Sequence, residues 1–228
     1  MKKTFIFAIA LLSLSSKFLY AQDNYTTREI NDLIVHLDWN KTIHSISEEI
    51  QGSPYLNEEF MVGEVYYDGK YKVTELPLRY NLYNDEIEYK DNNTPMAFAQ
   101  PDKIDKVIIG KNIFIYIQKN SLHKVSGFVR IWNDEYPSIL TKMKVEFFEK
   151  EAPKAIVESK PARFERRHDI HYLMKSPEEI EKIKSVKKLI QSLGNYEKEL
   201  TDFAKKEKIS SRNPKELANL LDHYHGLQ

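Results

Sequence analysis

The sequence predicts an α+β fold in which an antiparallel β-meander is followed by a C-terminal bundle of short helices. Between Phe60 and Phe148, apolar and polar residues alternate in short runs, as they do in half-buried strands. Brief turn signals separate these runs, and such short connections join antiparallel strands because parallel strands need a longer crossover. Beyond Ser176 the apolar residues recur with helical spacing. The pattern leaves open whether the meander curls into a partial barrel or folds into a sandwich.

The first 21 residues have the features of a secretory signal peptide. Lys2 and Lys3 precede an apolar run, 5–14, that is too short to span a bilayer, and Ala21 offers a small residue for cleavage before Gln22. An uncleaved N-terminal anchor is the alternative. The chain has no cysteine, which excludes a lipoprotein anchor, disulfides, thiol catalysis and thiolate metal sites. We therefore expect an exported protein whose apolar core suffices for folding.

The residues after the signal peptide, 22–51, are predicted to form an N-terminal helical segment. Gly52-Ser53-Pro54 then breaks the helical pattern, and a β domain is expected over 52–150. The apolar residues with helical spacing form two groups: Ile30, Leu33, Ile34 and Leu37, then Ile43, Ile46 and Ile50.

The β domain is expected to contain seven or eight strands. Asp68-Gly69 is the strongest hairpin signal, because glycine supplies the positive φ that a tight turn needs. Tyr71 begins the return strand, and a further strand is predicted at 76–82. Later strands are expected around 87–89, 96–99, 107–109, 113–117, 127–132 and 138–148.

A proline-punctuated connector, 151–176, and a helical segment, 177–228, complete the predicted organisation. Ser176-Pro177-Glu178-Glu179 has the form of a capping box and predicts the start of a helix. Short helices need packing partners, so we expect these to pack on one another or on the sheet. The remaining boundary signals are Gly194 as a helix end, Asn195 as the cap of a helix over 196–206, and Asn213-Pro214 as the start of the last helix.

Charge is unevenly distributed along the chain, although the formal net charge is zero. Residues 22–149 carry 14 Lys/Arg and 21 Asp/Glu, a net of −7, whereas 150–215 carry 17 Lys/Arg and 11 Asp/Glu, a net of +6. One interpretation is that helices carry solvated lysines, and the other is a basic surface for acidic partners such as lipid head groups. Nucleic acid is not expected as a partner of an exported protein that lacks aromatic–basic motifs on a strand platform.

The sequence contains no recognisable catalytic motif. A Gly-x-Ser-x-Gly elbow, a phosphate loop and a dinucleotide fingerprint are all absent. Two histidine clusters, His168-Asp169-Ile170-His171 and His223-Tyr224-His225, have spacings that could hold a metal, but neither belongs to a zinc signature. Neighbours on a strand point to opposite faces, which argues against acid–base sites at Glu58-Glu59 or Asp85-Glu86. We therefore expect no catalytic residue, no metal and no cofactor.

Aromatic residues supply the candidate binding site. Seven of the fourteen tyrosines lie within residues 55–89, which suits strands and would also suit a face that contacts sugar, peptide or lipid. Arg79 could pair with Glu86 or Glu88 across the Asn84-Asp85 turn, or hold a ligand anion. The candidate ligand-binding residues are Tyr66, Arg79, Tyr80, Tyr83 and Trp132, and an apolar pocket lined by Tyr80, Ile115 and Trp132 would favour a lipid or glycan ligand.

Three stretches carry a further signal: Gly52-Ser53-Pro54-Tyr55-Leu56-Asn57-Glu58-Glu59-Phe60 followed by Gly63, the run from Pro77 to Glu88, and Lys160-Pro161-Ala162-Arg163-Phe164. Together with the tail 187–224, they resemble a family of uncharacterised exported Bacteroidota proteins. The resemblance covers most of residues 50–225. It implies export to the envelope of a Gram-negative bacterium, with a location in the periplasm, at the outer membrane or outside the cell. It implies no activity.

We therefore expect a non-catalytic exported protein of the cell envelope that acts in binding or scaffolding. Its partner would be an envelope protein, a lipid or a glycan. The alternatives are a lipid- or glycan-binding module with an aromatic-lined curved sheet, and a hydrolase with an unrecognised site. No later run approaches about 18 uninterrupted apolar residues, so the cleaved chain is not expected to be an integral membrane protein. The sequence indicates no oligomeric state.

Overall fold

The computed structural model describes residues 34–36, 50–92, 94–119, 124–151 and 160–228. Within these ranges, eleven strands form one sheet in the order β1-β5-β4-β3-β2-β6-β7-β8-β9-β12-β13, and every neighbouring pair is antiparallel. Two further strands, β10 and β11, form a separate ribbon, and the helices follow the last strand. The elements are β1 Ile34–His36, β2 Met61–Tyr67, β3 Tyr71–Asn81, β4 Glu86–Asp91, β5 Thr94–Phe98, η1 Pro101–Lys103, β6 Ile104–Ile109, β7 Asn112–Ile117, β8 Gly127–Ile131, β9 Ser138–Lys142, β10 Val145–Phe148, β11 Arg163–Arg166, β12 Ile170–Ser176, β13 Glu179–Lys182, α2 Val186–Leu193, α3 Glu197–Lys206 and α4 Pro214–His225.

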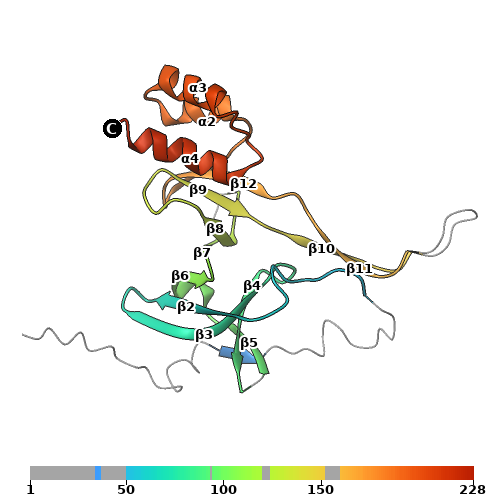
Figure 1. The fold of residues 1–228 in the computed structure, drawn as a ribbon. Coiled ribbons are helices and arrows are strands. Elements are labelled where there is room, and N and C mark those ends of the chain that lie inside the picture. Colours follow the sequence, from blue (N-terminus) through green and yellow to red (C-terminus); the bar gives the residue numbers. More distant parts are fainter. Residues whose placement is uncertain (1–33, 37–49, 93, 120–123, 152–159) are drawn as a thin grey trace, which may run out of the picture.

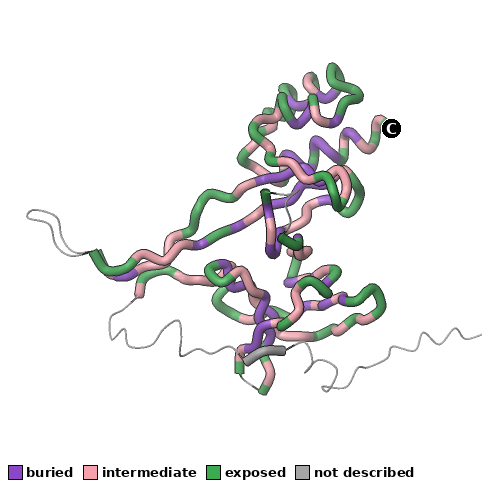
Figure 2. The backbone as a smooth tube through the Cα atoms, turned by 180° about the vertical axis from the view of Figure 1, so that it is seen from behind, coloured by how far each residue is buried: buried purple, intermediate pink, exposed green. Residues whose placement is uncertain are grey.

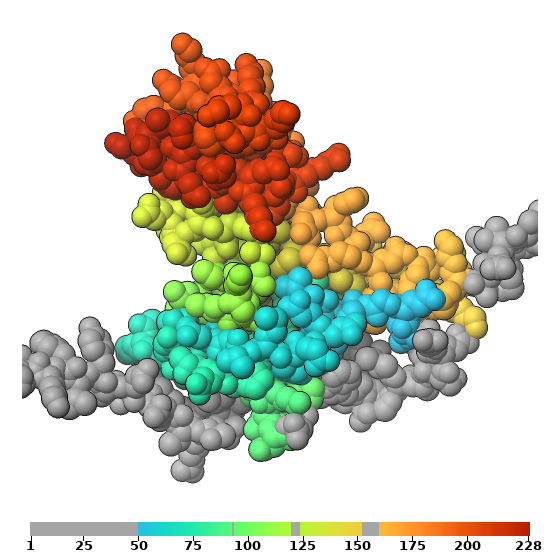
Figure 3. Space-filling model, in the orientation of Figure 1, coloured from blue at the N-terminus to red at the C-terminus, as the bar shows by residue number. Residues whose placement is uncertain are grey.

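This arrangement confirms the predicted α+β class, with an antiparallel sheet followed by helices. The described strand order is linear, so the sheet is open and has β1 and β13 at its two edges. Figure 1 shows β2–β5 at one end of the molecule, the helices stacked over β9 and β12 at the other end, and the β10–β11 ribbon projecting to one side as an arm. The space-filling view shows the helices as a distinct layer above the sheet (Figure 3).

The β2–β3 hairpin forms where the sequence predicts it. Asp68 and Gly69 have φ angles of 51° and 65°, and the Lys70 N–H donates to the Tyr67 carbonyl at 3.3 Å. Two successive positive φ angles give the turn the twist of the strands that it joins. The return strand β3 runs unbroken over 71–81, whereas the sequence predicts two separate strands. An irregularity in the β2–β3 register, together with a positive φ of 58° at Glu75, accommodates the change in alternation that suggested a break.

The apolar core has three parts. The first lies against β2–β7 and includes Leu78, which is fully buried. The second joins the helices to β9 and β12 through Ile139 and Leu173, which face each other across the two strands. The third lies on the opposite face of the same strands and includes Leu140 and Tyr172. Because β9 and β12 are buried on both faces, they hold the helical layer to the sheet (Figure 2).

The predicted connector and the first predicted helix are wrong in part, because strands occupy much of both. The connector 151–176 contains β11 and β12, and β13 follows where a helix was expected from Pro177. The Ser176 hydroxyl accepts a hydrogen bond from the Glu178 N–H within a strand-to-strand turn. Helix α2 begins at Val186 instead, with Ser185 as its N-cap accepting from the Lys188 N–H at 3.2 Å.

The N-terminal helical segment is wrong at the residues that can be compared. Ile34–His36 form strand β1, which pairs with β5 so that Ile34 lies opposite Phe98. Pairing with the exposed edge of β5 supplies backbone hydrogen bonds that helical spacing cannot reveal. The predicted signal peptide and residues 22–33 and 37–49 of the segment lie outside the described residues, and with them five of its seven apolar positions: Ile30, Leu33, Leu37, Ile43 and Ile46.

The other helix boundaries largely follow the sequence. Helix α2 ends at Gly194, which has a φ of 78°. Helix α4 is capped by Asn213, whose side chain accepts from the Lys215 N–H at 3.1 Å. Helix α3 begins after Tyr196 rather than Asn195, and Tyr196 makes no side-chain cap bond. The long strand predicted over 138–148 is divided into β9 and β10, because the chain leaves the main sheet after Lys142 and pairs with β11.

Candidate functional site

A basic groove lies where the helical layer, the edge of the sheet and the β10–β11 arm meet. It encloses ≈ 810 Å³ and is formed by the end of β9, the turn from β11 to β12, the segment from β13 to α2, and the loop before α4. Seven of its described lining residues are Lys or Arg and two are acidic, which gives a formal net charge of +5. The cations are Lys142, Lys144, Arg166, Arg167, Lys182, Lys184 and Arg212.

The cations on the sheet and arm side of the basic groove are paired with carboxylates. Glu146 accepts from Lys144 at 3.1 Å and from Arg167 at 3.2 Å, and Arg166 pairs with Asp169 at 3.0 Å. These pairs are solvent-exposed, so a ligand anion can compete for the cations.

Lys142 occupies the most sheltered cation position. Its ammonium lies 2.6 Å from Asp85, which is outside the groove lining, and 3.0 Å from the Phe128 carbonyl oxygen. Burial lowers the pKa of Lys142, and the adjacent Asp85 carboxylate opposes that shift. With Asp85 included, the formal net charge around the groove is +4.

The cations on the helical side have no such partners. Lys182, Lys184 and Arg212 are exposed, and none of them forms an ion pair with another described residue. Lys182 and Lys184 flank Ile183 in the segment from β13 to α2, and Arg212 directly precedes Asn213, the N-cap residue of α4. Three uncompensated positive charges therefore border the same groove.

Beneath these charges, His171 connects three walls of the groove through one buried and one partly buried hydrogen bond. Its Nε2 lies 3.2 Å from the Arg212 carbonyl oxygen, and its Nδ1 lies 2.9 Å from the Thr141 hydroxyl. A carbonyl can only accept, so Nε2 carries the proton and the neutral ring accepts from Thr141 at Nδ1. Thr141 in turn accepts from the Trp132 indole N–H at 2.8 Å. Burial lowers the pKa of His171, which favours this neutral form.

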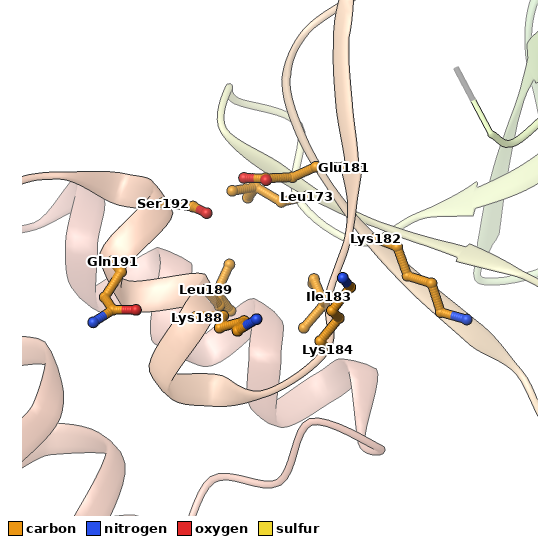
Figure 4. Close-up of a pocket in the computed structure, with 9 residues that line it drawn as sticks. All are labelled: Leu173, Glu181, Lys182, Ile183, Lys184, Lys188, Leu189, Gln191 and Ser192. Atoms are coloured by element: carbon orange, nitrogen blue, oxygen red, sulfur yellow. The ribbon is translucent and has the colours of Figure 1, made fainter. Parts of the chain in front are cut away.

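A second, smaller hollow adjoins the basic groove on the other side of the segment from β13 to α2. It encloses ≈ 370 Å³ between β12, β13 and α2, and it shares Lys182, Ile183 and Lys184 with the groove. Figure 4 shows that the Lys182 side chain points away from α2. Lys188 adds a further cation to the lining of this hollow. Positive charge therefore continues past the edge of the basic groove.

Arg79, a predicted ligand-binding residue, has structural partners on every side. Its Nε donates to Glu88 at 2.7 Å, and its guanidinium lies 3.7 Å and 4.4 Å from the ring centres of Tyr55 and Phe60. Glu88 is only 1 % exposed and also accepts from Asn81 at 2.9 Å. Burial, together with the Glu88 charge, raises the pKa of Tyr55 to about 12, and Arg79 opposes part of this shift. Arg79 thus fastens the chain before β2 to the sheet.

The other predicted binding residues do not share a site. Tyr80 is buried in the first core cluster, with its hydroxyl donating to Asp85 at 2.5 Å. Trp132 packs in the helical cluster and lies under the Arg130 guanidinium at 3.6 Å. Tyr83 is 40 % exposed and packs edge-on against Phe147 and Phe164, whereas Tyr66 and Ile115 line a separate hollow. The pocket predicted from Tyr80, Ile115 and Trp132 is therefore not formed.

The histidine clusters divide among different environments. His168 lines the basic groove beside His171, His223 stacks on Phe203 with ring centres 4.0 Å apart, and His225 lies 3.2 Å from the Pro137 carbonyl. In the part of the chain that the structure describes, no three His, Asp or Glu side chains are grouped so that they could hold a metal.

The acidic pairs also differ in setting. Glu58 and Glu59 are exposed. Asp85 and Glu86 line a hollow of ≈ 350 Å³, and burial raises the pKa of Glu86. Both oxygens of Asp85 are occupied, however, one by Tyr80 and the other by Lys142. Asp85 therefore acts as a structural acceptor in this arrangement.

Sequence analysis did not single out the cations of the basic groove, although the histidine cluster that it named, His168-Asp169-Ile170-His171, lies in the groove lining. The cations come from four separate segments, and no local motif connects them. The one available signal was the net charge of +6 over residues 150–215, where five of the seven groove cations lie. These five cations lie outside the helices, whereas six other lysines of the same region lie within α2, α3 and α4, so each of the two interpretations accounts for part of the surplus.

The chain matches no protein-family model, no curated protein and no solved structure. Among the helices of the described ranges, none has the length and hydropathy needed to cross a membrane.

Proposed function

We propose that this protein is an exported, non-catalytic binding protein of the cell envelope that holds an anionic ligand in its basic groove. The observation that carries the proposal is the unpaired set Lys182, Lys184 and Arg212, which lines the helical side of a concave site from two segments of the chain. Like charges that line one groove repel one another, and none of these three forms an ion pair with a described residue. A bound anion would supply the missing compensation. Export itself rests on the N-terminal pattern of residues 1–21.

A binding role is also supported by how the titratable groups of the site are used. His171 has both ring nitrogens in hydrogen bonds, and Asp85 has both oxygens in hydrogen bonds. A general acid or base needs a free position within reach of the substrate. These two groups position the chain, and the exposed cations, together with the exposed ring of His168, are left for contact with a ligand.

A lipid or glycan ligand on the sheet is the second candidate, favoured by the hollow that contains Tyr66. This hollow encloses ≈ 560 Å³, and its floor includes Ile113, Ile115 and Ile131. The Tyr66 ring lies between Lys72 and Lys106, at 5.1 Å and 4.5 Å from the ring centre. Native mass spectrometry would detect a copurified lipid or glycan, and Ile115→Trp should displace it by filling the hollow.

The test of the first proposal is thermal unfolding in the presence of a panel of anions. A ligand that binds the folded state raises the melting temperature in a concentration-dependent way. We expect such a rise for the unmodified protein and its loss in K182E/K184E/R212E. The matched control is K111E/K119E/K198E, which changes the net charge equally at exposed positions outside the groove. An equal rise in both variants would contradict the proposal.

A further inference from the structure

The charge density of the basic groove restricts the class of ligand that can fill it. The groove offers a space of ≈ 810 Å³, and the formal net charge to be matched there is +4 to +5. A carboxylate carries a charge of −1, so four or five acidic side chains would have to gather in this space. A phosphomonoester carries about −1.5 to −2 at pH 7, so three phosphoryl groups supply about −5. Phosphoryl groups therefore match the charge of the groove with fewer groups than carboxylates need.

The lining offers little for the recognition of rings. The described lining contains no Phe, Tyr or Trp, and of its two imidazole rings His171 is held by hydrogen bonds at both nitrogens, so His168 is the one exposed ring among the described lining residues on which a sugar or a base could stack. The nearest aromatic side chain in the hydrogen-bond network, Trp132, is separated from His171 by Thr141 and is covered by Arg130. Lysine and arginine must therefore do most of the recognition, through point charge and through the bidentate guanidinium fork.

A membrane surface is a poorer fit than a small molecule. Proteins that lie on anionic membranes combine basic residues with exposed apolar side chains that enter the interface. The large exposed apolar residues of the described ranges do not line the groove: they are Met61, Val62, Tyr83, Tyr136 and Tyr196. A concave site also keeps part of its charge away from a flat surface.

We infer that the basic groove binds a compact oligophosphate, meaning a ligand with three or more phosphoryl groups that fit together in this space. This inference rests on the proposed function and names the ligand class of the same site. Lys182, Lys184 and Arg212 contact the phosphoryl oxygens, and Lys144, Arg166 and Arg167 exchange their exposed carboxylate partners for them. Lys188 in the adjoining hollow extends the track for a longer chain.

Isothermal titration calorimetry on the full chain tests the inference with four probes. Inorganic tripolyphosphate represents a condensed phosphate, and inositol hexakisphosphate represents clustered phosphomonoesters. Triglutamate represents carboxylates, and phosphatidylglycerol vesicles represent a membrane surface. We expect one of the phosphate probes to bind at least about tenfold more tightly than triglutamate, and the tighter of the two identifies the source of the phosphoryl groups. K182E/K184E/R212E should weaken that binding at least about tenfold, whereas K111E/K119E/K198E should leave it near the unmodified value.

The dependence on salt gives a second readout. Salt screens the attraction between the cations and the phosphoryl groups, so the slope of log affinity against log salt concentration should be clearly less negative for the groove variant than for the control.

Failure of this inference is distinguishable from failure of the proposed function. If triglutamate binds as tightly as the phosphate probes and the groove variant weakens it, the oligophosphate class is overturned and the anion-binding groove stands. If only vesicles bind, the ligand is a membrane surface and the inference is wrong. If no probe binds, and no anion changes the melting temperature, both are wrong.

Discussion

Removing the charge of Arg79 while leaving Glu88 in place should strongly destabilise the fold. Glu88 is 1 % exposed, and its charge is met by Arg79 at 2.7 Å and by the Asn81 amide at 2.9 Å. The Arg79 side chain is itself only 11 % exposed, and it stacks between Tyr55 and Phe60. The substitution Arg79→Met keeps much of the side-chain volume but leaves a buried carboxylate without its ionic partner.

The size of the effect follows from this burial. Removing one partner of a buried ion pair costs about 3–5 kcal/mol, because the other charge stays desolvated. The lost stacking of the guanidinium adds about 0.5–2 kcal/mol, of which the methionine side chain recovers a part by packing. We therefore expect a loss of about 4 kcal/mol. With a urea m-value of about 2 kcal/mol/M, the midpoint of unfolding falls by about 2 M.

Equilibrium unfolding in urea, followed by circular dichroism, measures this loss. The double variant R79M/E88L removes both charges, and we expect it to recover to within about 1 kcal/mol of the unmodified protein, because an apolar pair can replace a buried ion pair. Lys144→Met is a control, since its exposed partner Glu146 stays hydrated and stability should change little. A small effect of Arg79→Met, or a double variant no more stable than the single one, would refute the reasoning.

Three further outcomes can be checked by the same unfolding measurements. Gly63→Ala should cost about 2–3 kcal/mol, because the new Cβ would lie 2.2 Å from the Ile108 carbonyl oxygen of the paired strand. In Gly69→Ala the new Cβ meets no atom within 4 Å, so this variant should lose only about 1–2 kcal/mol through backbone strain. Equal losses in the two variants would contradict this reasoning. Burial lowers the pKa of His171 in the folded protein below the unfolded value of about 6.5. The neutral ring therefore contributes its full stabilisation above about pH 6.5. This contribution is lost as the pH falls toward the folded pKa, by at most about 1.4 kcal/mol per pH unit. The stability difference between the unmodified protein and His171→Gln should therefore shrink below about pH 6.5, and a difference that does not change with pH would argue against a buried neutral ring. Leu220→Ala in the fully buried face of α4 should cost about 2–5 kcal/mol, and a loss below about 1 kcal/mol would mean that the helical layer is not integral to the core.

Local signals were sufficient where a backbone requirement selects the residue. Asp68-Gly69 needs two positive φ angles in succession, and Asn213-Pro214 satisfies the first free N–H groups of a helix, so both could be placed from sequence. Strand β12 could not be placed in this way. Its residues, Ile170–Ser176, are buried on both faces, so they do not alternate, and such a run cannot be distinguished from a helix by periodicity.

The pairing of Arg79 shows the intermediate case. The sequence restricted its partner to Glu86 or Glu88, and strand register decides between them, because Arg79 lies directly opposite Glu88 while Glu86 lies opposite Asn81. Register depends on the turn and on which face is buried, so one additional residue in the turn would have selected a different partner. The basic groove is harder still to predict, because its cations meet only after distant strands have paired.

His171 explains how a site made from such distant segments can have a defined geometry. Its side chain is bonded to Thr141 on β9 and to the Arg212 carbonyl, and its own carbonyl accepts from the Ile183 N–H at 2.9 Å. Arg212 is itself a cation of the groove. Thr141 directly precedes Lys142, and Ile183 lies between Lys182 and Lys184. These hydrogen bonds, of which the one to Thr141 is buried and the one to the Arg212 carbonyl is partly buried, therefore set the spacing of the backbone segments that carry the charges. A ligand that matches this spacing pays less ordering entropy on binding, and so the hydrogen-bond network beneath the groove contributes to affinity without touching the ligand.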